Sequence, residues 1–328
     1  MATNFQPKGD IKVIMGSGAK NLGTAHVASD TWNELQVVDY NIEHASAPID
    51  VAPSRSGIYG QVESQGHHRP DTQIYEVTLT MRGTPTAVLK SCLALFADGD
   101  SAAELTSAGN TGSMKDGVSN ANQVTLLFAN AGSDSSESTP NDDVVMAGCM
   151  ATQMVIREDV GTNGGEMVVE TTFISAYQPA ETALTPSSTT VDEAAPKNIF
   201  NLNASTLDAE PLVLNNFEIT ISRPLARVHH QNTTDYKPFG YVQTGPYEVT
   251  GSITAKRDDS IHDLIAHIKG DSAGIALSIA ESSGLTILLP DVMIDNSKPE
   301  VSDFLLQTIP FRAFGANESG NIISITIA

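Results

Sequence analysis

The sequence has little positive charge, few aromatic side chains and almost no cysteine. Lys and Arg number 18 against 39 Asp and Glu, so the formal net charge of the 328-residue chain is −21. Affinity for nucleic-acid phosphates comes from Lys and Arg, so this balance argues against a cationic nucleic-acid-binding protein. Aromatic residues make up 5% of the chain, with a single Trp, which argues against a carbohydrate-binding module built on aromatic platforms.

Long hydrophobic runs are also missing. A membrane-spanning helix needs about 20 apolar residues in succession, and the sequence contains no such run. Residues 1–10 have no apolar core, so we expect no signal peptide and no membrane association. Cys92 and Cys149 are too few for a disulfide framework, and neither has the spacing of a metal ligand. Hydrophobic residues still reach 40%, so we expect an acidic, soluble, folded protein of intracellular origin.

An internal repeat is the strongest positive signal. The sequence Tyr-Glu-Val-Thr occurs at residues 75–78 and again at 247–250, and each copy precedes an amphipathic helical pattern. Thr84 and Pro85 are suited to cap and begin the first helix, and residues 258–260 (Asp-Asp-Ser) the second. The apolar positions have the i, i+3, i+4, i+7 spacing of one helical face: Leu89, Cys92, Leu93 and Phe96, then Ile261, Leu264, Ile265 and Ile268.

Other strand-like segments match with changing offsets. The matched ranges are 37–42 with 213–219, 124–129 with 275–280, 154–156 with 292–294, and 167–177 with 304–314. The offset falls from 172 to 151 residues, which indicates a 21-residue acidic insertion near 104–122 in the first copy. We predict an N-terminal arm (1–30), a first unit (31–178), a solvated linker (179–198) and a second unit (199–328). The expected fold class is mainly β (α+β), with two tandem β-sandwich or half-barrel units, each with one flanking helix.

Motifs that could support catalysis or ligand binding fit poorly. Residues 270–274 (Gly-Asp-Ser-Ala-Gly) have the pattern of a nucleophile elbow, but the elbow needs a strand before it and a helix after it, and the order here is reversed. Residues 16–20 lack the features of a phosphate loop. Histidines occur as two adjacent pairs, His67–His68 and His229–His230. Neighbouring side chains on an extended chain face opposite sides, which argues against metal binding by either pair. We therefore predict no catalytic, cofactor or metal site, and keep a serine hydrolase using Ser272 as a distant alternative.

The repeated pattern resembles the tail tube proteins of long-tailed bacteriophages. The resemblance is carried by a hairpin with a long first loop, the strand Pro246–Thr254, a helix beginning Asp-Asp, and a closing set of strands, and it covers residues 31–177 and 212–328. It implies that inner strands join around a ring into one β-barrel and that rings stack into a tube through which DNA leaves the capsid. A fused duplicate implies a homotrimeric ring with pseudo-sixfold symmetry.

This resemblance implies a structural virion protein, not an enzyme, which is made in the host cytoplasm and incorporated into the tail. The implied partners are further copies of the chain and other tail proteins such as the tape measure, terminator and distal tail proteins. DNA would pass without specific binding, because an acidic lumen repels phosphate. The alternative is another tail, baseplate or capsid component.

Two sets of residues are candidate sites. Alternation along the repeated strands places Val77, Leu79 and Met81 inside the sandwich and their polar neighbours on the other face. The candidate lumen-facing residues are Glu76, Thr78, Thr80, Glu248, Thr250 and Ser252, with Glu170 and Gln307 as a further matched pair. The long loops at about 45–70 and 223–246 are expected to hold ring-stacking contacts, because they are polar and too long for simple hairpin turns. Candidate residues there are Gly57, Tyr59, His67, His68, Arg69, His229, His230 and Tyr236.

Overall fold

The computed structural model describes residues 11–44, 75–96, 102–106, 114–130, 143–177, 179–181, 184–202, 204–228, 239–256, 275–282, 284–295, 298–301, 305–315 and 320–327. Strands dominate this part of the chain, and one α-helix lies within it, so the mainly β fold is confirmed. The elements are β1 (Ile11–Ser17), β2 (Lys20–Asn21), β3 (Thr31–Glu34), β4 (Val37–His44), β5 (Tyr75–Arg82), α1 (Pro85–Leu95), β6 (Ala102–Thr106), β7 (Ser119–Asn120), β8 (Val124–Asn130), β9 (Val144–Asp159), η3 (Asn163–Gly165), β10 (Val168–Ser175), β11 (Ala180–Glu181), β12 (Thr190–Val191), η4 (Ile199–Asn201), β13 (Thr206–Leu207), β14 (Glu210–Pro211), β15 (Leu214–Ser222), β16 (Leu225–Val228), β17 (Gly240–Gln243), β18 (Glu248–Lys256), β19 (Ile275–Ala280), β20 (Thr286–Ile294), β21 (Lys298–Val301), β22 (Leu305–Ala313) and β23 (Asn321–Thr326).

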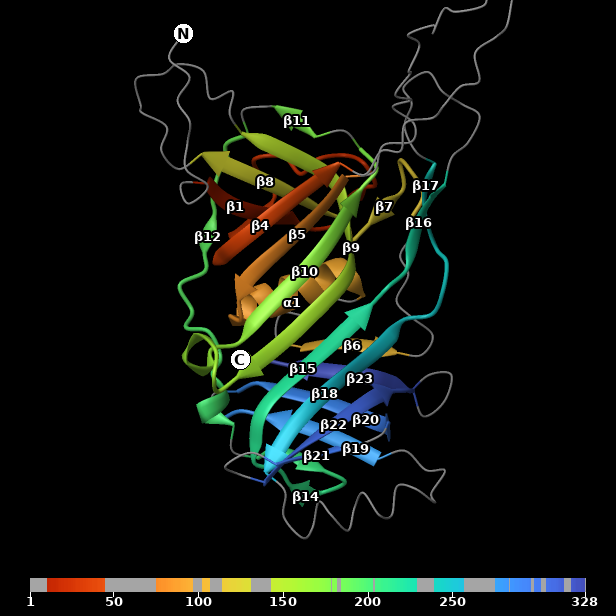
Figure 1. The fold of residues 1–328 in the computed structure, drawn as a ribbon. Coiled ribbons are helices and arrows are strands. Elements are labelled where there is room, and N and C mark those ends of the chain that lie inside the picture. The colour runs from red at the N-terminus through yellow and green to blue at the C-terminus, as the bar shows by residue number, and fades with distance from the viewer. Residues whose placement is uncertain are drawn as a thin grey trace, which may run out of the picture.

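Seven strands form one continuous antiparallel sheet that runs diagonally across the molecule in Figure 1. The order of its strands is β4–β5–β10–β9–β15–β18–β22. The first four strands come from the first predicted unit and the last three from the second. The pairing of β9 with β15 therefore joins the two halves of the chain into one sheet.

The remaining long strands form a second layer behind this sheet. In the first half, β1 pairs with β3 and β8, and β8 pairs with the beginning of β9. In the second half, β19 pairs with β20, and β20 pairs with β23. The 16-residue strand β9 passes from the back layer into the front sheet, where its second half pairs with β10. The end of β20 likewise pairs with β22 of the front sheet, and β21 continues along the same edge of β22.

The order of strand pairing is therefore the same in both halves. The first half pairs β4–β5–β10–β9–β8, and the second pairs β15–β18–β22–β20–β19. The matched register of β10 and β22 differs from the sequence match of 167–177 with 304–314. Val77 lies opposite Phe173 and Val249 lies opposite Ala313, so Phe173 corresponds to Ala313 and the offset is 140 residues instead of 137. Both segments contain two adjacent apolar residues followed by Glu or Gln and then Thr, at 168–171 and 305–308, and this local likeness favours the shifted alignment.

The predicted first helix is confirmed. Thr84 is the N-cap of α1 and accepts a hydrogen bond from the backbone N–H of Ala87 at 3.2 Å, and proline follows at the first helical position. Cys92 and Phe96 of the predicted stripe are fully buried. The helix packs on the buried face of the front sheet and makes most of its contacts with β9 (Figure 1). The predicted second helix, with the stripe from Ile261 to Ile268, lies outside the described residues.

Two segments predicted as an arm and a linker contribute to the sheets. Within the arm predicted at 1–30, β1 pairs with β8 along its length, and its Met15 is fully buried. Within the segment predicted as a solvated linker, β11 pairs with β9 and β12 with β3, while Asp192 and Lys197 are buried. The polar composition of this segment hid these pairings, because backbone hydrogen bonds need no apolar side chain.

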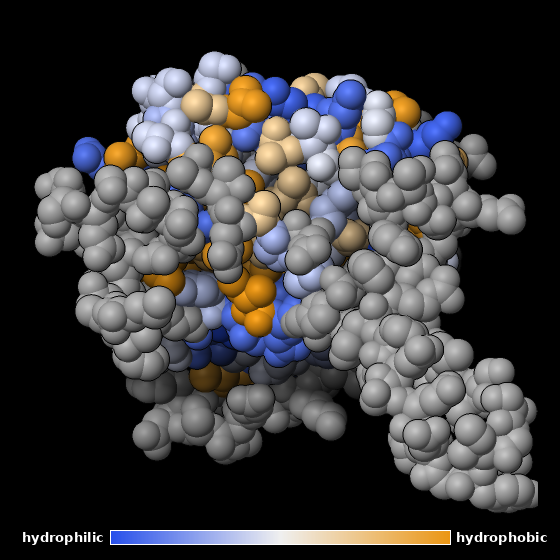
Figure 2. Space-filling view, turned by 90° about the horizontal axis from the view of Figure 1, so that it is seen from above, coloured by the Kyte–Doolittle hydropathy of each residue, from blue (hydrophilic) through white to orange (hydrophobic). Residues whose placement is uncertain are grey.

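The predicted insertion also contributes to the second half of the molecule. Strand β6, at its beginning, pairs antiparallel with β23 and so extends the back layer. None of the described helices is long and apolar enough to cross a membrane. Seen from above, the described part of the surface has hydrophobic residues scattered among hydrophilic ones (Figure 2).

Candidate functional site: a polar sheet face between two edges

Polar side chains form rows across the face of the seven-stranded sheet that is turned away from the core. Because paired residues on neighbouring strands lie side by side, the strand register defines these rows. Three rows cross the junction of β9 with β15: Asp39–Thr80–Glu170–Val155–Thr220–Thr250–Arg312, Asn41–Thr78–Thr172–Gln153–Ser222–Glu248, and Arg82–Val168–Arg157–Glu218–Ser252–Pro310. Glu43 and Glu76 are paired in a fourth row.

All six candidate lumen residues lie on this polar face and are partly or fully exposed. Thr80 shares a row with Thr250, and Thr78 shares a row with Glu248. Their apolar neighbours are buried, as predicted: Val77, Leu79 and Met81 have no exposed surface.

One proposed match on this face is wrong. Glu170 lies in the first row, but Gln307 is only 5% exposed and belongs to the buried positions of β22. Strand pairing places Pro310, instead of Gln307, at the position that corresponds to Glu170. The error follows from the three-residue misalignment of β10 and β22, since an odd shift exchanges the two faces of a strand.

The polar face is acidic on balance. Across the four rows, six carboxylates stand against three guanidinium groups: Asp39, Glu43, Glu76, Glu170, Glu218 and Glu248, against Arg82, Arg157 and Arg312. Arg157 forms an ion pair with Glu170 at 3.7 Å, and Arg82 with Glu166 at 2.8 Å. The face therefore presents a mixed but net negative surface.

The sheet ends in two edges that have no partner strand within the described residues. At one end, β4 pairs with β5 on one side only, and its Val38 and Ile42 are 67% and 40% exposed. At the other end, β20 and β21 pair with β22 on one side, and Met293 is 59% exposed. Open edges with exposed apolar side chains are typical places for pairing with another chain.

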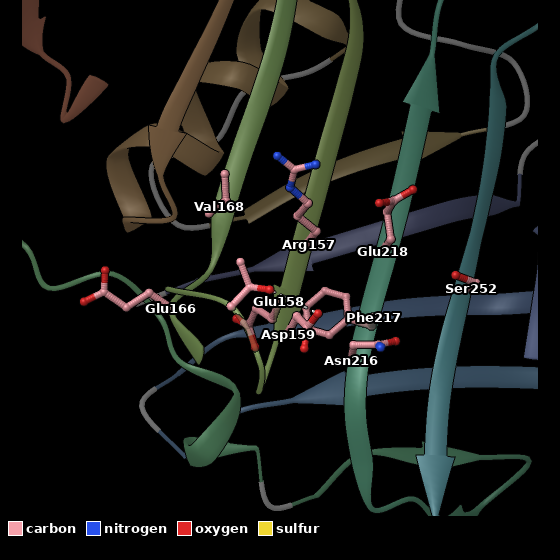
Figure 3. Close-up of a pocket in the computed structure, with 10 residues that line it drawn as sticks. Arg157, Glu158, Asp159, Glu166, Val168, Asn216, Phe217, Glu218 and Ser252 are labelled. Atoms are coloured by element: carbon pink, nitrogen blue, oxygen red, sulfur yellow. Dashed lines mark hydrogen bonds between the residues drawn. The ribbon is translucent and has the colours of Figure 1, made fainter. Parts of the chain in front are cut away.

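A pocket of about 490 Å³ opens where β9 meets β15. Figure 3 shows Arg157 on β9 beside Glu218 on β15, with Val168 and Ser252 on the outer strands and Glu158 and Asp159 at the end of β9. Thr162, Glu166, Asn216 and Phe217 complete the lining. Although four carboxylates line this pocket, the described residues contain no group of three or more His, Cys, Asp or Glu arranged to hold a metal ion.

Glu158 is the unusual residue of this pocket. It is 2% exposed, and neither of its carboxylate oxygens has a hydrogen-bond partner within the part of the chain that the structure describes. Burial, and to a smaller extent repulsion from Glu281, raises the pKa of Glu158 to about 8. Glu281 itself accepts a hydrogen bond from the backbone N–H of Asn198 at 2.9 Å and lies 3.8 Å from the ammonium of Lys197.

Other acids of the pocket have partners. Asp159 accepts hydrogen bonds from the backbone N–H of Gly161 and the hydroxyl of Thr162, and Glu166 accepts three from the guanidinium of Arg82. Sequence reasoning missed Glu158, because an Arg-Glu-Asp triplet at a strand end is typical of a solvated turn. Its position between apolar Ile156 and the chain reversal at 160–167 was the only available signal.

The candidate ring-stacking residues and the hydrolase candidate lie outside the described residues. This applies to Gly57, Tyr59, His67, His68, Arg69, His229, His230 and Tyr236, and to Ser272. The base of the second long loop is described: β16 and β17 pair with each other, and the hydroxyl of Tyr241 donates to the carbonyl of Gly148 at 3.1 Å. This loop therefore begins against the first half of the chain.

Comparison with known proteins is informative at the level of the family. A family model described as phage tail tube protein matches residues 3–313. The match extends over both halves of the chain and over the junction of β9 with β15. No curated protein matches the chain.

Proposed function

The chain belongs to the phage tail tube protein family, which makes it a structural protein of the phage tail, and on this premise we propose that it is the major tail tube subunit. Three copies form a ring with pseudo-sixfold symmetry, in which each chain supplies two consecutive sheet segments. Rings stack into a tube through which DNA passes without specific binding. The subunit has no enzymatic role and meets the tape measure, terminator and distal tail proteins in the assembled virion tail.

The observation that carries this proposal is the junction of β9 with β15. It joins two halves that have the same order of strand pairing, so it serves as a template for joining one chain to the next. In the first half, β9 pairs with β10 along one side and with β15 along the other. In the second half, the corresponding side of β20 and β21 pairs with no strand of the described residues, and neither does the outer side of β4, the counterpart of β15.

The template also predicts the register between chains. In the junction, Ser222 lies opposite Gln153 and Ile221 opposite Met154. Transferring these pairs through the matched strand pairings places Glu43 of one copy opposite Met293 of the next. Ile42 then lies opposite Ile294. Closing the ring in this way pairs every open edge of the front sheet, which is how barrels avoid aggregation.

The polar face would form the inner wall of this barrel. Its six carboxylates outnumber its three guanidinium groups, so the wall repels the DNA backbone, which carries about one negative charge per 1.7 Å of helix axis. Corresponding residues such as Thr80 and Ser252 lie in different rows, because the strands are staggered. Such a stagger is required when strands tilt around a closed barrel.

A disulfide between chains tests the ring directly. Glu43→Cys combined with Met293→Cys should give covalent trimers on a non-reducing gel after mild oxidation, because each of three junctions is closed once. The native thiols of Cys92 and Cys149 do not interfere, since both are fully buried and burial raises the pKa of each to about 12. Glu43→Cys combined with Phe200→Cys is the matched control, because Phe200 is 67% exposed and lies on η4, away from both edges. Cross-linked dimers or hexamers in place of trimers would overturn the proposed stoichiometry.

A further inference from the structure

Exposed apolar side chains gather at the end of the front sheet where β9 ends and β15 begins. Val160, Phe200 and Val213 are 36%, 67% and 63% exposed. The backbone N–H of Val160 donates to the carbonyl of Asn215, two residues beyond Val213. Phe200 belongs to η4, which contacts β15, and its ring lies so close to Gly165 that a Cβ there would be 2.9 Å from it. We call Val160, Phe200 and Val213 the turn patch.

A second exposed apolar surface lies beyond the other end of β15. In Figure 1, β15 rises from the turn patch toward the hairpin of β16 and β17 at the upper right. Val242 of β17 is 46% exposed. Lys115 forms a β-bridge with Gly240 of the same strand, which brings Val118, 38% exposed, beside the hairpin. The ammonium of Lys115 is 5.2 Å from the ring centroid of Phe239. We call Val118 and Val242 the hairpin patch.

The two patches are too far apart to meet within one chain. Strand β15 has nine residues, so its ends are about 26 Å apart at about 3.3 Å per residue. Single exposed apolar residues are common on protein surfaces, but a group of them on one surface is typical of an interaction site. Each patch can meet the other on a second copy. Such head-to-tail contacts between identical chains produce open stacks when the rotation between copies does not close a ring.

A second copy of the chain is the occupant that the observations favour. Membership of the tail tube family implies self-assembly, and copies in a tube meet end to end. The charges beside the patches agree with this contact, because Lys115 is exposed at the hairpin patch and Asp159 adjoins the turn patch. Glu166 near the turn patch is paired with Arg82 at 2.8 Å. Lys256 lies on β18, which is on the other side of β15 from β9.

We propose that the turn patch of one copy docks on the hairpin patch of a copy in the adjacent ring. The contact covers apolar side chains on both copies and brings Asp159 of one toward Lys115 of the other. Each chain supplies one turn patch and one hairpin patch, so every trimeric ring makes the same set of contacts with the ring above and the ring below. This inference rests on the proposed function, because it requires stacked rings.

Charged substitutions in the patches separate stacking from folding. Phe200→Glu and Val242→Glu should each leave the thermal midpoint unchanged, because both side chains are exposed, and leave trimers intact, because neither residue lies on the open edges of the front sheet. Each should raise the protein concentration needed for tube growth roughly tenfold, because docking would bury the new carboxylate among apolar side chains.

Leu288→Glu is the matched control. Leu288 is 38% exposed on β20 of the back layer, between Ser278 and Ser324 on the neighbouring strands, and it belongs to neither patch. Its tube growth should equal that of the wild type. Unchanged tube growth in Phe200→Glu and Val242→Glu, an equal loss in Leu288→Glu, or a loss of trimers in the patch variants would overturn the proposal.

Cross-linking tests which surfaces meet. The double variant Phe200→Cys with Val242→Cys, treated with a short bismaleimide, should give a ladder of chains longer than one ring, and only in assembled tubes. Phe200→Cys with Leu288→Cys is the control and should give no ladder. Products no larger than a trimer would place the contact within one ring and overturn the proposal, as would the absence of products.

The wild-type chain distinguishes the two levels of the proposal. If the purified chain forms neither trimers nor tubes, the proposed function fails. Trimers that do not stack without other tail proteins would overturn a second copy as the occupant of the patches. If tubes form but the patch variants and the cross-linker have no effect on them, only the docking of the two patches fails.

Discussion

Strands β4 and β15 occupy the same position in the two halves of the molecule, but their surroundings differ. Both pair with the strand that follows the long loop, β5 in one half and β18 in the other. Ile221 of β15 is fully buried, because β9 covers the other side of its strand, whereas the corresponding Ile42 of β4 is 40% exposed. The comparison teaches that the neighbouring strand decides burial here. Strand β4 has the composition of an interior strand, but the described residues give it only one neighbour, β5.

The largest expected effect is on stability, when each of the two corresponding isoleucines is replaced. Ile221→Ala should lower the free energy of unfolding of the isolated chain by about 2–5 kcal/mol, because it leaves a cavity in the core. Ile42→Ala should cost less than about 1 kcal/mol in the isolated chain, as for other surface substitutions, yet weaken trimer formation. Denaturant unfolding at concentrations where the chain is monomeric, followed by sedimentation at higher concentration, measures both. Equal losses of stability would mean that β4 is already covered within one chain.

Local features of the fold could be predicted from the sequence, and contacts between distant segments could not. The cap at Thr84 and the alternation from Val77 to Met81 depend on neighbours within a few residues, so both were predictable. The junction of β9 with β15 depends on pairing between strands more than fifty residues apart, which no local pattern encodes.

The candidate site was accordingly predictable in part. Thr78 and Thr250 were placed on one face by alternation, but the shared sheet that brings them together was not foreseen. Glu158 was missed, because a sequence does not show whether a charged residue at a strand end has solvent or protein beside it. The role of the polar face as a lumen wall stays a prediction.

The second effect concerns Glu158 in β9. Strand pairing gives it Pro299 of β21 as its counterpart in the second half, so only the first half has an ionisable group at this position. The pKa of Glu158 is raised from 4.5 to about 8 in the folded chain, so between these pH values the folded state holds a proton that the unfolded state has lost. Stability therefore falls as pH rises from about 5 to 8 and levels off above 8. Glu158→Gln removes this dependence and should stabilise the chain at pH 9 by a few kcal/mol, at about 1.4 kcal/mol per pKa unit.

Thermal or urea unfolding at pH 5, 7 and 9 measures this effect. Glu218→Gln is the control, because Glu218 lines the same pocket but is exposed. Wild type and Glu158→Gln with parallel pH profiles would contradict the account of Glu158 as a buried, protonated acid.

The third effect compares matched acids of the two halves, Glu76 and Glu248. Replacing both with Lys reverses two charges per chain on the polar face, so a lumenal position would turn repulsion of DNA into attachment. We expect DNA ejection from assembled virions to slow roughly tenfold at low salt, equivalent to about 1.4 kcal/mol in the barrier, and to recover at high salt. Lysine at Thr162, which lies in the turn after β9, is the control outside these rows. Slow ejection that salt does not relieve would place these glutamates elsewhere.

The smallest effect concerns two threonine pairs, one in each half. The hydroxyls of Thr78 and Thr172 are 3.2 Å apart, and those of Thr254 and Thr308 are 3.0 Å apart. Thr254 is 6% exposed, whereas Thr78 is only half-buried, so water can replace the lost bond at Thr78 but not at Thr254. Thr254→Val should therefore cost about 1 kcal/mol of unfolding free energy and Thr78→Val a few tenths of that. The double variant Thr78→Val with Thr172→Val should be close to wild type, because neither partner is then left unpaired. Urea unfolding of the monomeric chain measures all three, and a cost at Thr78 equal to that at Thr254 would mean that the polar face is shielded from water within a single chain.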